Sequence, residues 1–179
     1  GSFGRGFTSF LDENIAKNEQ GDILYNREDG STIQFYRQDD GSYLAPEGCD
    51  LKLRLQKTGE KVVTLSSGDV LIPVYCYRIE REDGSVVTFD ETGVMVERAD
   101  KNGAVLQIMH DAVSGNVTGF MREGAGFMVE TNERGCVTRI ICPDGSSVAY
   151  GYDSADNLVT VKNQSGHEKQ FVYDENHLM

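Results

Sequence analysis

The chain has 179 residues, of which 39% are hydrophobic and 26% are charged, and it contains 20 Gly, 3 Pro and no Trp. Its formal net charge of −12 repels phosphate and sulfate groups, which argues against nucleic acid, heparin and anionic lipid as partners. Tyr, Phe, Val, Ile and Leu recur throughout, which argues against disorder, and no apolar run approaches the roughly 20 residues that span a bilayer.

The first 88 residues predict β-strands separated by tight turns. Asp-Gly supplies the positive φ angles that short hairpin loops need, and three Asp-Gly-Ser triplets lie between β-rich runs, at 29–31, 40–42 and 83–85. Leu51, Leu53 and Leu55 alternate with polar residues, which predicts one apolar face of a strand.

The segment from 58 to 79 continues this pattern. Thr58-Gly59-Glu60 leads into another β-rich run at 61–65, and the apolar run 70–79 contains Pro73, which indicates an edge or a bulge. No stretch has an i, i+3, i+4 stripe of apolar residues that is long enough for a helix. The sequence therefore predicts an all-β fold, an antiparallel meander of hairpins.

From Phe89 onward, residues recur with a fixed spacing of 21. The anchor pairs, an aromatic or similar residue followed by Asp or Asn, are Phe89-Asp90, His110-Asp111, Thr131-Asn132, Tyr152-Asp153 and Tyr173-Asp174. A glycine follows each of the first four anchors after 14 residues, at Gly103, Gly124, Gly145 and Gly166. This spacing predicts units at 89–109, 110–130, 131–151 and 152–172, with the start of another at 173.

Each unit is expected to hold two strands and two turns. Apolar residues alternate in the strand after each glycine, as at Leu106 and Ile108, Phe127 and Val129, Val148 and Tyr150, and Phe171. We expect Tyr152 and Tyr173 to pack between layers with their hydroxyl groups near water. The Asp or Asn after each anchor is expected to accept hydrogen bonds from the turn backbone. A single unit cannot bury its apolar face, so the units are predicted to stack into a twisting sheet.

Residues 135–153 read as Gly, a short strand, Pro-Asp-Gly, an aromatic residue and Tyr-Asp, which resembles the YD-repeat (Rhs) family. Residues 152–174 match the pattern again, and His177-Leu178 resembles the His-Leu that often follows Tyr-Asp. Phe3-Gly4-Arg5-Gly6-Phe7 resembles the opening of the domain that precedes YD repeats. His110 and Thr131 depart from the aromatic anchor, so the middle units are degenerate.

The resemblance implies a hairpin domain at 3–83 and YD-type repeats at 84–179, wound into a solenoid-like sheet. It also implies a large bacterial protein, secreted or at the cell surface, whose repeat shell encloses or displays a C-terminal toxin or adhesive cargo. The partner would be the remainder of the same polypeptide. Gly1-Ser2 is interpreted as a cloning remnant, and both ends are expected to be cut from a longer chain whose targeting signal lies elsewhere. No catalytic residue is carried over from the family.

Two other functions remain open: a module that binds glycans or a cell-surface receptor through exposed Tyr and Phe, and, more remotely, a hydrolase. The sequence predicts no catalytic, cofactor-binding or metal-binding residue, because His110, His167 and His177 lack a fixed carboxylate spacing. Gly124-Ala125-Gly126 lacks the strand–loop–helix context of a phosphate loop. Four cysteines are interpreted as small buried residues, with one disulfide as the alternative: Cys49, Cys76, Cys136 and Cys142.

The last predicted strand, ending at 171–173, is expected to leave an unpaired edge beside uncovered Phe171 and Tyr173. Weak self-association of the chain through this edge is therefore predicted.

Overall fold

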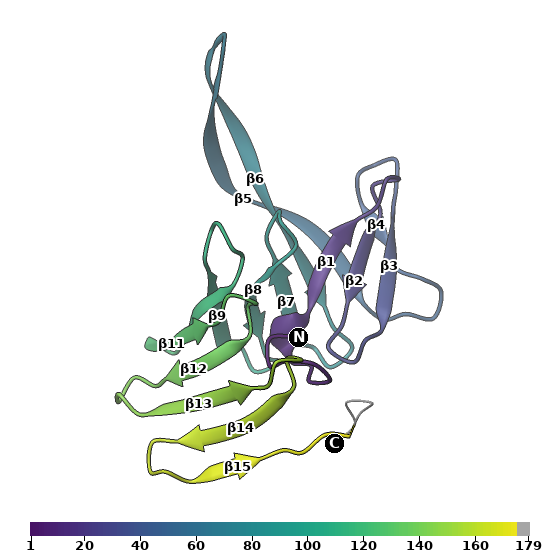
Figure 1. Cartoon of the computed structure of the whole chain (residues 1–179). Coiled ribbons are helices and arrows are strands. Elements are labelled where there is room, and N and C mark those ends of the chain that lie inside the picture. The colour runs from purple at the N-terminus through teal and green to yellow at the C-terminus, as the bar shows by residue number, and fades with distance from the viewer. Residues whose placement is uncertain (175–179) are drawn as a thin grey trace. The chain divides into compact units, whose positions relative to one another are not determined.

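The computed structural model describes residues 1–174 and is all-β with antiparallel sheets, as predicted (Figure 1). Within these residues the only helix is a 3-10 turn, Phe10–Asp12, and no helix is long and apolar enough to cross a membrane. The strands belong to two compact units. Unit A comprises Asn14–Asn26 and Gly30–Val105, and unit B comprises Gly1–Glu13, Arg27–Asp29 and the chain from Leu106 onward. The division into domains at 3–83 and 84–179 stays a prediction.

Unit A contains two runs of consecutively paired strands. The first has the order β1 (Asn14–Lys17), β2 (Ile23–Asn26), β3 (Thr32–Arg37) and β4 (Tyr43–Leu44). The second has the order β5 (Lys52–Leu65), β6 (Gly68–Glu80), β7 (Val86–Phe89) and β8 (Met95–Ala99). Their apolar faces meet, because Tyr25 and Phe89 stack edge to face at 5.7 Å and Tyr43 and Tyr77 at 6.3 Å.

The core of unit A lies between these two runs and is built from alternate strand residues. Its fully buried members are Ile23, Tyr25, Phe35, Ile79, Val87, Phe89 and Met95. Burying each of these side chains contributes about 1.5–3 kcal/mol. Leu51 and Leu53 join the core, but Leu55 is 42% exposed. The predicted apolar face of β5 is therefore only partly buried, because the strand continues beyond the core.

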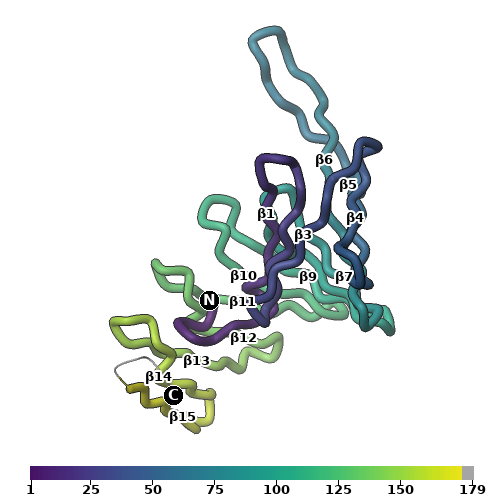
Figure 2. The backbone as a smooth tube through the Cα atoms, turned by 90° about the vertical axis from the view of Figure 1, so that its right-hand side faces the viewer, coloured from purple at the N-terminus to yellow at the C-terminus, as the bar shows by residue number. Residues whose placement is uncertain are grey.

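That continuation is a long two-stranded hairpin formed by the distal parts of β5 and β6 (Figure 2). Strand β7 pairs with β6 only from Tyr77 to Glu80, so the residues before Tyr77 have β5 as their one neighbour in the ladder. Pro73 lies in this two-stranded part, opposite Glu60, which confirms the predicted edge position. A bulge lies between Lys57 and Gly59 within one continuous strand, so the segment 58–60 is not a break between two strands.

Unit B holds seven consecutively paired strands, which carry the predicted anchors His110, Thr131 and Tyr152, whereas the anchor Tyr173 follows the last strand. The strands are β9 (Val105–His110), β10 (Val117–Arg122), β11 (Ala125–Thr131), β12 (Val137–Ile141), β13 (Ser147–Tyr152), β14 (Leu158–Asn163) and β15 (Glu168–Gln170). The predicted alternation is confirmed: Leu106, Ile108, Phe127 and Val129 are buried or half-buried, and Gln107 and Met128 are exposed. Solenoid-like winding stays a prediction.

Candidate functional site

The four Asp and Asn residues that follow the first four anchors each begin a turn and accept hydrogen bonds from its backbone. The carboxylate of Asp153, for example, accepts from the amides of Ala155 and Asn157, both at 2.9 Å. The other three side chains accept equivalent bonds from backbone amides: Asp90 from Thr92, Asp111 from Val113 and Ser114, and Asn132 from Arg134 and Cys136. The predicted role of these side chains is confirmed. The fifth, Asp174, is the last residue that the structure describes.

The phased glycines occupy the second turn of each unit. Gly103, Gly145 and Gly166 have φ angles of 87°, 86° and 88°, a region that favours glycine. Gly124 lies instead in a two-residue loop between the paired Arg122 and Ala125. The first turn of the repeat at 110–130 is one residue longer than the first turns of the other repeats, because the Asp111 amide donates to the Asn116 carbonyl. The longer first turn and the short loop at Gly124 compensate for each other, so this degenerate repeat keeps the 21-residue spacing.

The anchor residue itself is opposite the first residue of the following strand. Tyr152 pairs with Leu158, as Phe89 does with Met95, and the two partners Leu158 and Met95 are buried. A bulge accompanies the pairing in each case. The anchor therefore closes the hairpin that it begins.

The tyrosine anchors also form hydrogen bonds to the preceding 21-residue repeat. The sequence did not predict these bonds. The Tyr152 hydroxyl donates to the Val137 carbonyl at 2.5 Å, and the Tyr173 hydroxyl donates to the Leu158 carbonyl at 2.7 Å. Val137 and Leu158 are themselves 21 residues apart, so the two bonds are equivalent. Each hydroxyl therefore has a backbone partner in a part-buried setting, and burial raises the pKa of both tyrosines. The expectation that the hydroxyls also lie near water stays a prediction. We call this contact the tyrosine clamp.

The anchors without a phenol are held differently. Phe89 is fully buried against Tyr25, and Thr131 is half-buried. His110 is half-buried, and its Nδ1 lies 3.1 Å from the Gly115 carbonyl in its own turn. A side chain without a phenolic hydroxyl cannot make the tyrosine clamp.

The N-terminal segment supplies three aromatic rings that pack on the rest of unit B. Phe3 contacts Tyr150 at 5.1 Å, Phe7 contacts Phe171 at 5.9 Å and Phe10 contacts Phe120 at 6.2 Å. The expectation that Phe171 is uncovered is therefore wrong: Phe171 is half-buried beneath Phe7, and Tyr173 is half-buried too.

Backbone bonds fix the same segment. The Val137 amide donates to the Ser2 carbonyl and the Arg5 amide to the Asp156 carbonyl, both at 2.7 Å. A Cβ on Gly4 would lie 2.9 Å from the Tyr152 ring, so the first glycine of the Gly-x-Gly motif permits close approach to a clamp tyrosine. In the sequence, this motif is identified only by its resemblance to a family. Its contacts join residues that are far apart in the sequence, so local patterns do not reveal them.

Titratable and thiol side chains are scattered. Cys76 and Cys136 are buried, as interpreted, whereas Cys49 and Cys142 are half-buried, and all four are free thiols. Burial raises the pKa of the Cys76 thiol. Among residues 1–174 no three His, Cys, Asp or Glu side chains gather where a metal ion could be held. His177-Leu178 lies outside the described residues.

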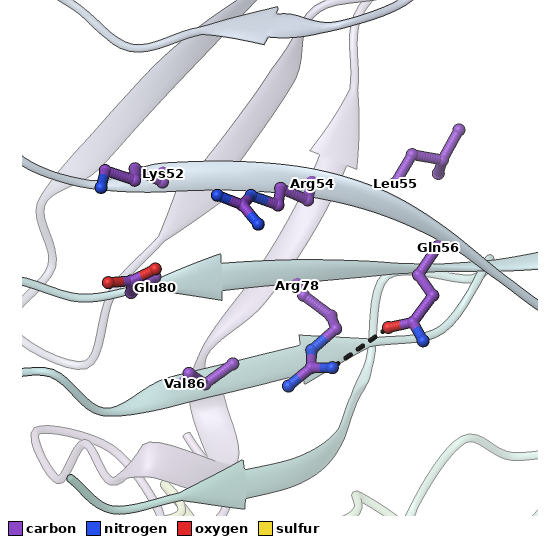
Figure 3. Close-up of a pocket in the computed structure, with 7 residues that line it drawn as sticks. All are labelled: Lys52, Arg54, Leu55, Gln56, Arg78, Glu80 and Val86. Carbon is purple, nitrogen blue, oxygen red and sulfur yellow. Dashed lines mark hydrogen bonds between the residues drawn. The ribbon is translucent and has the colours of Figure 1, made fainter.

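One pocket concentrates positive charge on this acidic chain. It lies on strands β5 to β7 of unit A and has a volume of about 400 Å³ (Figure 3). Its lining residues are Lys52, Arg54, Leu55, Gln56, Arg78, Glu80 and Val86. The residues are exposed or half-buried, and the alternation in β5 places Lys52, Arg54 and Gln56 on one face of the strand. Sequence reasoning missed this site.

No protein-family model matches the chain, and no curated protein matches it. The resemblance to the YD-repeat family therefore stays a prediction.

Proposed function

We propose that this chain is a structural segment of a longer YD-repeat sheet in a secreted or cell-surface bacterial protein. In this proposal the sheet winds into a shell that encloses or displays a toxin or adhesive cargo, and its partner is the rest of the same polypeptide. The segment itself carries no catalytic role.

The observation that carries the proposal is the tyrosine clamp. The bond from Tyr152 to Val137 and the bond from Tyr173 to Leu158 link a unit to the one before it, at a constant offset of 15 residues. A contact that repeats with the sequence spacing allows further units to be added without new chemistry, as in other repeat architectures.

The C-terminal strand supports the same proposal. Among residues 1–174, β15 is the last strand of its sheet and pairs only with β14. Its other edge is where the first strand of a following unit would pair, just as β14 pairs with β13.

The test is a chain with one additional unit. A second copy of residues 152–172 is inserted between Val172 and Tyr173, so that the added Tyr-Asp follows β15 in phase. Added repeats stabilise repeat proteins through new interfaces, so we expect a higher melting temperature and more strand signal in circular dichroism. The matched control inserts the same 21 residues in scrambled order. Equal melting temperatures for the two insertions would contradict the proposal.

A further inference from the structure

The pocket on β5 to β7 contains two arginines placed directly opposite each other. Arg54 in β5 is the cross-strand partner of Arg78 in β6, and Lys52 is the partner of Glu80. Like charges directly opposite each other in a sheet are unfavourable. The pocket contains three cationic side chains and one carboxylate, although the whole chain carries 29 acidic and 17 basic residues. Positive charge therefore exceeds negative charge among the residues that line this pocket.

The two guanidinium groups differ in how they are held. The Arg78 Nη1 donates to the Gln56 Oε1 at 3.1 Å, which orients this side chain in the pocket (Figure 3). Among residues 1–174, the Arg54 side chain has no hydrogen-bond or ion-pair partner, so its guanidinium donors are free for a ligand. Arg78 also keeps donors beyond the one used for Gln56.

We propose that this pocket binds the carboxylate of a terminal acidic sugar. Planar guanidinium groups match carboxylate oxygens, so Arg54 and Arg78 together hold the anion, with Lys52 adding positive charge. Glu80 accepts hydrogen bonds from sugar hydroxyl groups, and the free amide donors of Gln56 bind sugar oxygens. Val86 supplies the apolar contact. The volume of about 400 Å³ lies within the range for small-ligand sites.

Charge favours a sugar with one carboxylate over an acidic peptide. A peptide with several carboxylates would meet repulsion from Glu80 and from the net charge of −12, whereas an acidic sugar brings one anion and several hydroxyl groups. The inference goes beyond the structural role proposed above, because a repeat sheet can extend whether or not this pocket binds a ligand.

The experiment titrates the full chain with methyl glucuronoside, up to about 20 mM, and follows backbone amide shifts by NMR. Methyl glucoside, which lacks the carboxylate, is the matched neutral probe, and tetraglutamate is the peptide probe. Three variants are compared: Arg54→Gln, Arg78→Gln and the control Arg122→Gln, an exposed arginine of unit B with the same change in charge. Unperturbed spectra away from the pocket show that each variant is folded.

We expect saturable shifts for glucuronoside at 52–56, 78–80 and 86, and none for glucoside. We expect binding at least tenfold weaker in both pocket variants and unchanged in Arg122→Gln. Absence of saturable shifts, equal weakening in the control, or equal binding of the neutral sugar would overturn the proposal. Tighter binding of tetraglutamate than of glucuronoside would also overturn it, in favour of a peptide site.

Discussion

Removing one hydroxyl group tests whether the tyrosine clamp stabilises unit B. In Tyr152→Phe the ring stays, but the bond to the Val137 carbonyl is lost. A typical hydrogen bond contributes about 1 kcal/mol, and leaving a partly buried acceptor unpaired adds to the loss, so we expect destabilisation by about 1.5 kcal/mol. The control is Tyr150→Phe, on the same strand, since the Tyr150 hydroxyl has no hydrogen-bond partner among residues 1–174 and its contact with Phe3 is a ring contact. We expect less than about 0.5 kcal/mol there.

The assay is urea unfolding followed by far-ultraviolet circular dichroism, with thermal melting as a second measure. For a chain of this size, 1.5 kcal/mol corresponds to a decrease in melting temperature of about 3–6 °C. Equal destabilisation by Tyr152→Phe and Tyr150→Phe would show that the tyrosine clamp does not stabilise unit B, because both variants lose the same atom and only one loses a hydrogen bond.

Three further predictions follow from the same contacts. Burial raises the pKa of Tyr152 above its ordinary value, so the contribution of this tyrosine to stability is complete below about pH 10 and is lost as the pH rises further. The difference in melting temperature between the parent chain and Tyr152→Phe should therefore be smaller in alkaline solution than at neutral pH. Gly119 lies outside the 21-residue spacing of the phased glycines, so this spacing alone predicts that replacing Gly119 costs less than replacing Gly145. However, a Cβ at Gly119 would lie 2.7 Å from the Phe127 carbonyl, whereas a Cβ at Gly145 would meet open space, at a φ of 86°. We therefore expect Gly119→Ala to lower the melting temperature more than Gly145→Ala, and the reverse order would contradict the packing. Self-association through the last strand is expected to be weak, because β15 is short; sedimentation over a concentration series, with and without proline at the 81% exposed Val172, measures it, and dimers unaffected by the proline would exclude this edge.

Local chemistry made the turns and strands of unit B predictable. Asp90, Asp111, Asn132 and Asp153 bond to backbone atoms within four residues of themselves, so their role can be read from the sequence. The alternation of apolar residues in β9 and β11 likewise depends only on the period of a strand.

Long-range contacts were not predictable in this way. The clamp from Tyr152 to Val137 depends on how neighbouring hairpins are aligned, and its atoms include a backbone carbonyl that every residue possesses. The pairing of Arg54 with Arg78 depends on the register of β5 and β6, which is set by a short turn before Gly68 and by the bulge near Gly59. Neither feature has a distinct sequence signal, so the pocket became visible only in the folded chain.

In the proposed repeat sheet, a repeating contact joins successive 21-residue units, and the edge of β15 is a position for another unit. Amide hydrogen exchange in β15 measures whether this edge becomes paired, in the parent chain and in the chain with a second copy of 152–172. Pairing of both edges protects amides that otherwise exchange with water. We predict slower exchange at residues 168–170 in the extended chain by at least about tenfold, with no change in the chain carrying the scrambled insertion. Unchanged exchange at 168–170 in the extended chain would contradict this proposal.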